Sequence, residues 1–128
     1  MVAYSYKKQF VPQILAGTKL YTLRANGKRA HATVGQMLQF YCAMRTKHCF
    51  KIMPDLPCTL VGAVEVDVGG SHIRSVSSPF GHHIGGDLDD FAVSDGFEDA
   101  SAMHAFWVEN HGTGVFHGRL ISWNKAYL

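Results

Sequence analysis

The stretch PQILAGTKLYTLR, residues 12–24, contains a short helix, the end of that helix and the strand that follows it. Pro12 is well suited to the first turn of a helix, where its missing amide hydrogen costs no hydrogen bond. Gly17 is typical of the residue after the last turn, because it adopts the left-handed backbone conformation without strain. Residues 20–23 are rich in strand formers. The stretch therefore predicts a short helix that ends at Gly17 and a strand immediately after it.

The same kind of strand pattern extends along the rest of the chain. Apolar and aromatic residues alternate or cluster in five further segments, each of which predicts a strand or an extended segment. These segments are 5–10, 36–44, 58–68, 72–78 and 114–123. Most of the strands follow one another too closely for helical crossovers. The chain therefore predicts an α+β fold, a small, partly open β-barrel with short helices on its side, in a single domain over 1–128.

Helices and connections occupy the intervening segments. Residues 99–112 repeat apolar residues at helical spacing and end at a glycine, which predicts an amphipathic helix. Residues 81–90 are predicted to form a loop that leads into a helix capped by Asp87 or Asp89. Residues 45–57 are predicted to be a basic connection that ends in proline.

Composition restricts the class of protein. The 128 residues are 47% hydrophobic and 17% charged, which is typical of a folded globular domain and not of a disordered chain. The sequence has no apolar run of about 20 residues, so no membrane span is predicted. It has no recognisable export signal, so we expect a cytoplasmic protein. The three cysteines, Cys42, Cys49 and Cys58, cannot all pair within one chain, and free thiols are expected.

Charge is distributed unevenly along the chain. Residues 1–54 contain nine Lys or Arg and no Asp or Glu, whereas residues 55–128 contain three and ten. Such an asymmetry predicts an electropositive surface for a polyanion. The alternative is that the two parts of the chain neutralise each other across the fold.

Lys19, Thr22 and Arg24 lie close together at the start of the strand after Gly17. Thr22 and Arg24 are two residues apart, so their side chains share a face of the strand, and a bend at the turn would bring Lys19 to the same face. Two cations beside a hydroxyl are costly to bury without partners. The three side chains therefore either face solvent or line a cleft for an anionic or strongly polar ligand.

Four segments of the chain resemble the ASCH domain family, a branch of the PUA-like β-barrels. They are FVPQILAGTKLYTLR at 10–24, VGQMLQFY at 34–41, SDGFEDASAMHAFW at 94–107 and GVFHGRLISW at 114–123. The insertion MRTKHCFKIMPDLPC at 44–58 is most similar to a subgroup encoded by bacteriophages and prophages. The resemblance implies a PUA-like barrel with short flanking helices. It also implies that the Lys-x-x-Thr-x-Arg segment lies in the floor of the cleft.

The resemblance implies a domain that binds RNA or a modified nucleoside. In this role the basic side chains would contact phosphates and an aromatic ring would stack on a base. The phosphate contacts would be Lys19, Arg24, Lys28 and Arg29, the stacking ring Tyr21 or Tyr41, and Arg45 and Lys47 would extend the basic surface.

The same cleft is compatible with catalysis. One ASCH branch hydrolyses the amide of acylated cytidine, which implies Thr22 as nucleophile, Lys19 as its base and a carboxylate from Asp95 or Glu98. Asp95 replaces a glutamate of those enzymes and is one methylene shorter. Other ASCH proteins are linked to RNA cleavage, so a ribonuclease is a further alternative. A third alternative is a protein-interaction module whose basic face meets an acidic partner.

The cysteines and histidines give weaker signals. Cys42, Cys49 and Cys58 with His48 do not have the spacing of a common zinc module, so no metal is predicted, and no cofactor either.

His82 and His83 lie among glycines and either form a mobile loop over the cleft or have no role. Trp107 and Trp123 are predicted to pack in the core. His111 is predicted to be a surface or half-buried residue.

Overall fold

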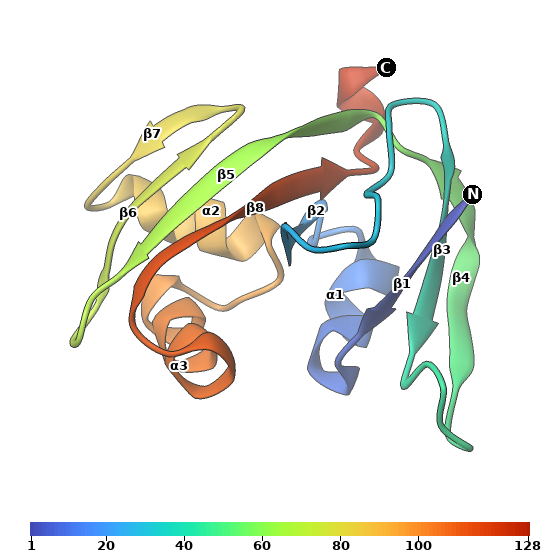
Figure 1. Ribbon diagram of the computed structural model, residues 1–128, viewed down its shortest axis with the longest axis horizontal. Coiled ribbons are helices and arrows are strands. Elements are labelled where there is room, and N and C mark those ends of the chain that lie inside the picture. The colour runs from blue at the N-terminus through green and yellow to red at the C-terminus, as the bar shows by residue number, and fades with distance from the viewer.

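The computed structural model describes residues 1–128, which form an α+β fold of two sheets, three α-helices and two short 3₁₀ helices (Figure 1). The strands are β1 (Val2–Tyr6), β2 (Tyr21–Ala25), β3 (Met37–Cys42), β4 (Phe50–Pro57), β5 (Leu60–Val68), β6 (Ile73–Ser78), β7 (Gly81–His83) and β8 (Gly114–Ser122). The helices are η1 (Lys8–Phe10), α1 (Val11–Ala16), α2 (Asp87–Ser94), α3 (Ala100–His111) and η2 (Lys125–Tyr127). The predicted α+β class is confirmed.

The stretch 12–24 folds as its sequence predicts. Pro12 lies in the first turn of α1, and Gly17 ends the helix with a φ of 79°. The chain then crosses to β2, whose first residues are buried. Lys19 lies in the connection between α1 and β2, which turns its side chain inward although it precedes the strand.

The larger sheet has the order β2-β8-β5-β6-β7, and every neighbouring pair is antiparallel. The long strands β5 and β8 pair over their whole length, from Leu60 opposite Ser122 to Val68 opposite Gly114. Helices α2 and α3 contact each other and pack against this sheet, as Figure 1 shows. Alternate residues of β5 are buried, among them Val64 and Val66, and they form the core beneath the helices.

The smaller sheet has the order β1-β3-β4. Its β1 and β3 are parallel, with Val2 opposite Leu38, and β3 and β4 are antiparallel. The prediction of a connection over 45–57 is wrong, because most of this segment forms β4. Its proline residues are tolerated because β4 lies at the edge of the sheet, where an amide hydrogen has no strand to bond.

Arginine side chains bridge the facing edges of the two sheets. Arg24 of β2 donates from its terminal guanidinium nitrogen to the carbonyl oxygen of Ser5 in β1 at 2.9 Å. Arg29, in the loop after β2, donates to the carbonyl oxygen of Ala3. Since no strand ladder joins β1 to β2, these side chains satisfy carbonyl groups at an otherwise unpaired edge.

The two later helices begin differently. Asp99 caps α3, since its carboxylate accepts a hydrogen bond from the Ala102 amide at 2.8 Å, and Gly112 ends the helix. The predicted cap of α2 by Asp87 or Asp89 is wrong, because Gly86 precedes the helix and no side chain caps it. Asp89 instead accepts a hydrogen bond from the Ala100 amide. None of the helices has the length and apolar character needed to span a lipid bilayer.

Candidate functional site

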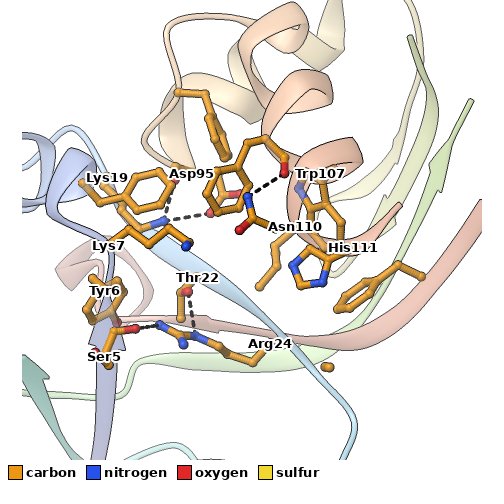
Figure 2. Close-up of a pocket in the computed structure, with 16 residues that line it drawn as sticks. Ser5, Tyr6, Lys7, Lys19, Thr22, Arg24, Asp95, Trp107, Asn110 and His111 are labelled. Atoms are coloured by element: carbon orange, nitrogen blue, oxygen red, sulfur yellow. Dashed lines mark hydrogen bonds and ion pairs between the residues drawn. The ribbon is translucent and has the colours of Figure 1, made fainter. Parts of the chain in front are cut away.

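A cavity of about 390 Å³ lies where the end of β1, the start of β2 and the last turns of α3 approach one another. Figure 2 shows its polar side chains. Half of its lining residues are hydrophobic, and most of these are aromatic. The lining comprises Ser5, Tyr6, Lys7, Phe10, Lys19, Thr22, Leu23, Arg24, Ala25, Asp95, Phe97, Phe106, Trp107, Asn110, His111 and Phe116. The three residues that the sequence placed together, Lys19, Thr22 and Arg24, all belong to this one cavity.

Lys19 and Asp95 form a buried ion pair in the cavity wall. The Lys19 ammonium lies 3.0 Å from the Asp95 Oδ1 and donates a second hydrogen bond, of 2.5 Å, to the backbone carbonyl of Asp95. It also lies 4.7 Å from the centre of the Phe10 ring, within the range of a cation–π contact. Both side chains are almost completely buried. The pair therefore brings one positive and one negative charge out of water, next to a space that a ligand can enter.

Burial moves the proton affinities of the two groups toward each other. Burial lowers the pKa of Lys19 from its ordinary value, and the Asp95 carboxylate opposes this change. Burial raises the pKa of Asp95, and the Lys19 ammonium opposes that change. In both groups burial is the larger effect, so the neutral forms are more accessible than they are in water.

Gly96 gives Lys19 the space that it needs. Its φ is 99°, in the left-handed region that favours glycine. A Cβ at this position would lie 2.9 Å from the Lys19 Cδ and 2.9 Å from a ring carbon of Phe10. Gly96 follows Asp95 directly, so the same turn after α2 positions the carboxylate and admits the lysine stem.

Thr22 and Arg24 lie side by side on β2 below the ion pair (Figure 2). The Nε of Arg24 donates to the Thr22 Oγ1 at 3.1 Å, which leaves the hydroxyl hydrogen of Thr22 available to a ligand. The guanidinium also lies 4.9 Å from the centre of the Tyr6 ring. No hydrogen bond joins Thr22 to Lys19. Arg24 therefore holds the Thr22 hydroxyl in place, and its own guanidinium contributes positive charge to the cavity lining.

The opposite wall comes from α3. The Asn110 amide nitrogen donates to the Phe106 carbonyl at 2.8 Å, and its oxygen is left facing the cavity (Figure 2). The His111 ring packs against Trp107 at a tilt of 39°, with ring centres 4.6 Å apart. Burial lowers the pKa of His111, and the ammonium of Lys7 adds to this effect across the mouth of the cavity. The wall thus offers aromatic faces, one free acceptor and a histidine that favours its neutral form.

The charged lining is predominantly positive. Lys7, Lys19 and Arg24 contribute three cations, and Asp95 contributes the only anion, which Lys19 already neutralises. The cavity therefore combines hydrogen-bond donors and net positive charge with aromatic rings. This arrangement suits a flat, polar ligand with oxygen acceptors.

The two predicted stacking residues lie outside the cavity. Tyr21 is buried against α2, where its hydroxyl donates to the Phe91 carbonyl at 2.6 Å, and burial raises its pKa. Tyr41 is half-buried in β3, and its ring centre lies 6.0 Å from the Lys51 ammonium. Neither residue lines the cavity. Its aromatic rings are those of Tyr6, Phe10, Phe97, Phe106, Trp107 and Phe116.

The remaining predicted residues do not converge on the cavity either. Lys28 and Arg29 are exposed in the loop after β2, and Arg29 also lies over the Tyr4 ring at 5.1 Å. Arg45 and Lys47 are exposed in the turn between β3 and β4. The alternative carboxylate, Glu98, is exposed and is absent from the cavity lining, whereas Asp95 belongs to it.

The cysteines are free. Cys42 and Cys58 are buried and Cys49 is exposed. No group of three or more His, Cys, Asp or Glu side chains is arranged to hold a metal ion.

His82 and His83 form part of β7, where their rings hydrogen-bond to the hydroxyls of Ser77 and Ser78 in β6. They line a different depression, beside α2, and do not cover the cavity.

Sequence reasoning missed the contribution of α3 and of the end of β1. Lys7, Asn110 and His111 carry no local pattern that marks them, because only the packing of α3 against β5 and β6 places its last turn across the cavity from the end of β1. Trp107 was predicted to be a packing residue. It is buried, but it also lines the cavity.

Comparison with family models, with curated proteins and with solved structures gives no match for this chain.

Proposed function

We propose that the chain is a PUA-like domain of the ASCH type and that its cavity binds a modified nucleoside. The observation that supports this most directly is that Lys19, Thr22, Arg24 and Asp95 line one cavity that aromatic residues of α3 close on the other side. The volume of about 390 Å³ falls within the common range for small-ligand sites, roughly 300–1,000 Å³. A nucleoside has the required chemistry, a flat ring with oxygen acceptors and N–H donors.

The fold is consistent with an open barrel of this type. The edge strands β1 and β2 face each other, and arginine side chains connect them where a closed barrel would have a strand ladder. In the proposed complex, the base stacks on the aromatic wall, and the free oxygen of Asn110 accepts a hydrogen bond from a base N–H. Lys19 and Arg24 interact with the oxygen acceptors.

Binding is tested with N4-acetylcytidine and, as a comparison, cytidine. Of the two tryptophans in the chain, Trp107 lines the cavity and Trp123 lies in the core. Binding should therefore change the tryptophan fluorescence of the wild type saturably and leave that of Trp107→Phe nearly constant, while calorimetry detects binding in both. Absence of binding at millimolar nucleoside would contradict the proposal and leave a protein-interaction role as the stronger reading.

A matched pair of variants locates the ligand. Asn110→Ala removes the free acceptor and should weaken nucleoside binding about fivefold, the effect of one hydrogen bond of about 1 kcal/mol. Glu109→Ala, at the neighbouring exposed position outside the lining, should leave the affinity unchanged. Equal effects of the two substitutions would place the ligand elsewhere.

Amide hydrolysis is the second candidate, because Lys19, Thr22 and Asp95 line the same cavity. The Thr22 hydroxyl would attack the acyl carbon as a neutral Lys19 accepts its proton, and the proton would pass to the departing amine of the base. Water would then cleave the acyl-threonine ester to release acetate. The lowered pKa of Lys19 favours this step, and the Asp95 carboxylate opposes it by stabilising the ammonium.

Release of acetate from N4-acetylcytidine tests this candidate. Thr22→Ala and Lys19→Ala should each abolish turnover, and their effects should not add, because a nucleophile and its base act as one unit. Lys19→Arg should be nearly as damaging, since arginine stays protonated. Asp95→Glu should raise activity if the shorter carboxylate limits the wild type. Nucleoside binding without turnover in the wild type would leave Thr22 as a binding hydroxyl.

A further inference from the structure

A second depression adjoins the cavity on the far side of β1. Its volume is about 740 Å³, and we call it the β1 groove. The end of β1 and the start of η1 form one side, and the turn between β3 and β4 forms the other. The groove is lined by Ser5, Tyr6, Lys7, Lys8, Gln9, Cys42, Ala43, His48 and Phe50.

The groove and the cavity share part of their lining. Ser5, Tyr6 and Lys7 belong to both. Ser5 links the two structurally, since its carbonyl accepts a hydrogen bond from Arg24 and its hydroxyl accepts one from the Met44 amide at 3.2 Å. The cavity and the groove therefore adjoin at the end of β1.

The groove has positive charge and no acidic residue. Lys7 and Lys8 are exposed, and neither has an ion-pair partner, whereas Lys19 and Lys51 are both paired with aspartates. No Asp or Glu lines the groove. Unpaired ammonium groups beside the exit of a nucleoside site are suited to bind phosphate groups.

Phe50 provides an exposed aromatic face in the same groove. Its side chain is 45% exposed, although it begins a strand. The turn before it contains two non-glycine residues with left-handed backbone, Ala43 with a φ of 55° and Arg45 with a φ of 66°. Such conformations are costly and persist where surrounding structure holds them. Here Thr46 holds the turn through hydrogen bonds to the Ala43 carbonyl and from the His48 amide.

We infer that the β1 groove binds the nucleotide that follows the modified nucleoside in a single strand. The phosphodiester would lie at Lys7, where cavity and groove meet, and the next base would stack on Phe50 with Lys8 near its phosphate. Cations interleaved with an exposed aromatic ring are the usual means of binding single-stranded nucleic acid. This inference rests on the proposed function and specifies its substrate as a modified base within a strand.

Calorimetry at low salt compares two ligands, free N4-acetylcytidine and N4-acetylcytidine joined through a 3′,5′-phosphodiester to uridine. The dinucleotide should bind at least tenfold more tightly. This gain should shrink as salt is added, because a phosphate contact releases counterions, whereas the affinity of the uncharged nucleoside should stay constant. A deoxyribose in the second nucleotide distinguishes an RNA strand from a DNA strand as the natural source.

Variants test whether the additional affinity for the dinucleotide comes from the β1 groove. Lys8→Ala and Phe50→Ala should each remove most of the gain and leave free-nucleoside binding unchanged, because neither residue lines the cavity. Lys125→Ala and Phe80→Ala remove an exposed lysine and an exposed aromatic ring elsewhere, and both should keep the gain. Circular dichroism confirms that each variant is folded.

The possible failures are distinguishable. Equal affinity for the two ligands would overturn the groove inference and leave the nucleoside site intact. A gain that survives in Lys8→Ala and Phe50→Ala would also overturn it, since the second nucleotide would lie elsewhere. If neither ligand binds, the proposed function fails and the groove inference fails with it.

Discussion

Lys19 and Asp95 set the charge in the wall of the cavity. The pair is almost completely buried and has both a side-chain and a backbone hydrogen bond. A buried pair of this kind costs much of its attraction in lost hydration, but removing one partner leaves an uncompensated charge. The pair is therefore more important for keeping the wall intact than for the net stability of the fold.

Removing the lysine alone should be far more costly than removing both charges. Lys19→Met should lower the free energy of unfolding by about 3–5 kcal/mol, and the double variant Lys19→Met/Asp95→Leu should recover a large part of the loss. Urea denaturation measures both. Lys51→Met removes the exposed partner of the Lys51–Asp55 pair, which is far less buried than Lys19–Asp95, and should cost much less stability. A double variant as unstable as the single one would contradict this account.

The same pair makes stability depend on pH in a defined direction. The pKa of Asp95 is raised above 3.8, so its contribution is present below that pH and is lost as the pH rises through the folded-state pKa. The pKa of Lys19 is lowered below 10.5, so its contribution is present above that pH and is lost as the pH falls through the folded-state pKa.

The stability of the wild type relative to Lys19→Met/Asp95→Leu should therefore pass through a minimum between the two folded-state pKa values. Urea denaturation of both proteins from about pH 4 to about pH 10 measures this difference. A difference that is constant across the range would show that the two groups titrate in the folded protein as they do in water.

Individual residues of the site were predictable where strand geometry decides their direction. Thr22 and Arg24 share a face because they are two residues apart, and both reach the cavity. The direction of Tyr21 follows from the same alternation, which turns it to α2 and away from the cavity. Asn110 and His111 were not predictable, because their position at the cavity depends on how α3 packs against β5 and β6.

At the scale of elements, strong local signals were sufficient to predict where a helix ends, and weak ones were not sufficient to predict a strand. Gly17 and Gly112 mark helix ends in the sequence and in the structure, whereas the cap of α3 by Asp99 became evident only in the structure. The strand β4 was missed because its two prolines and its basic start resemble a connection. Its pairing with β3 supplies the stability that its own residues do not indicate.

The cap of α3 should affect both stability and binding, because α3 carries one wall of the cavity. Asp99→Ala removes the hydrogen bond to the Ala102 amide and should cost about 1 kcal/mol of unfolding free energy. The urea midpoint should fall at an unchanged slope. Ser101→Ala, two residues further on at an exposed position, should not lower the midpoint. Equal losses in the two variants would mean that the cap contributes nothing specific.

Over the whole molecule, the charge asymmetry of the sequence is only partly neutralised. Of the nine cations before residue 55, Lys19 and Lys51 pair with aspartates of the second part. Some of these cations are therefore neutralised across the fold, and others remain on the surface. The cations that remain exposed lie beside the cavity and the β1 groove at Lys7 and Lys8, and along the loops at residues 28–29 and 45–47.

Binding of single-stranded RNA should weaken as salt increases, with log affinity falling linearly against log salt concentration. Lys28→Ala combined with Arg29→Ala should flatten this slope, by about 0.7 for each phosphate that the protein no longer neutralises. Arg74→Ala combined with Lys125→Ala removes two exposed cations from the second part and is the matched control. Filter binding at several salt concentrations measures the slopes. Identical slopes for both double variants would exclude the loop after β2 from the RNA-binding surface.

The exposed thiol of Cys49 lies between His48 and Phe50 in the turn that borders the β1 groove, and the other two thiols are buried. Under oxidising conditions, a disulfide between two molecules would therefore form at this turn. Such a covalent dimer would hold the two grooves against each other and obstruct both. Oxidised protein would then bind nucleoside normally but show no additional affinity for a dinucleotide, and a reductant would restore it.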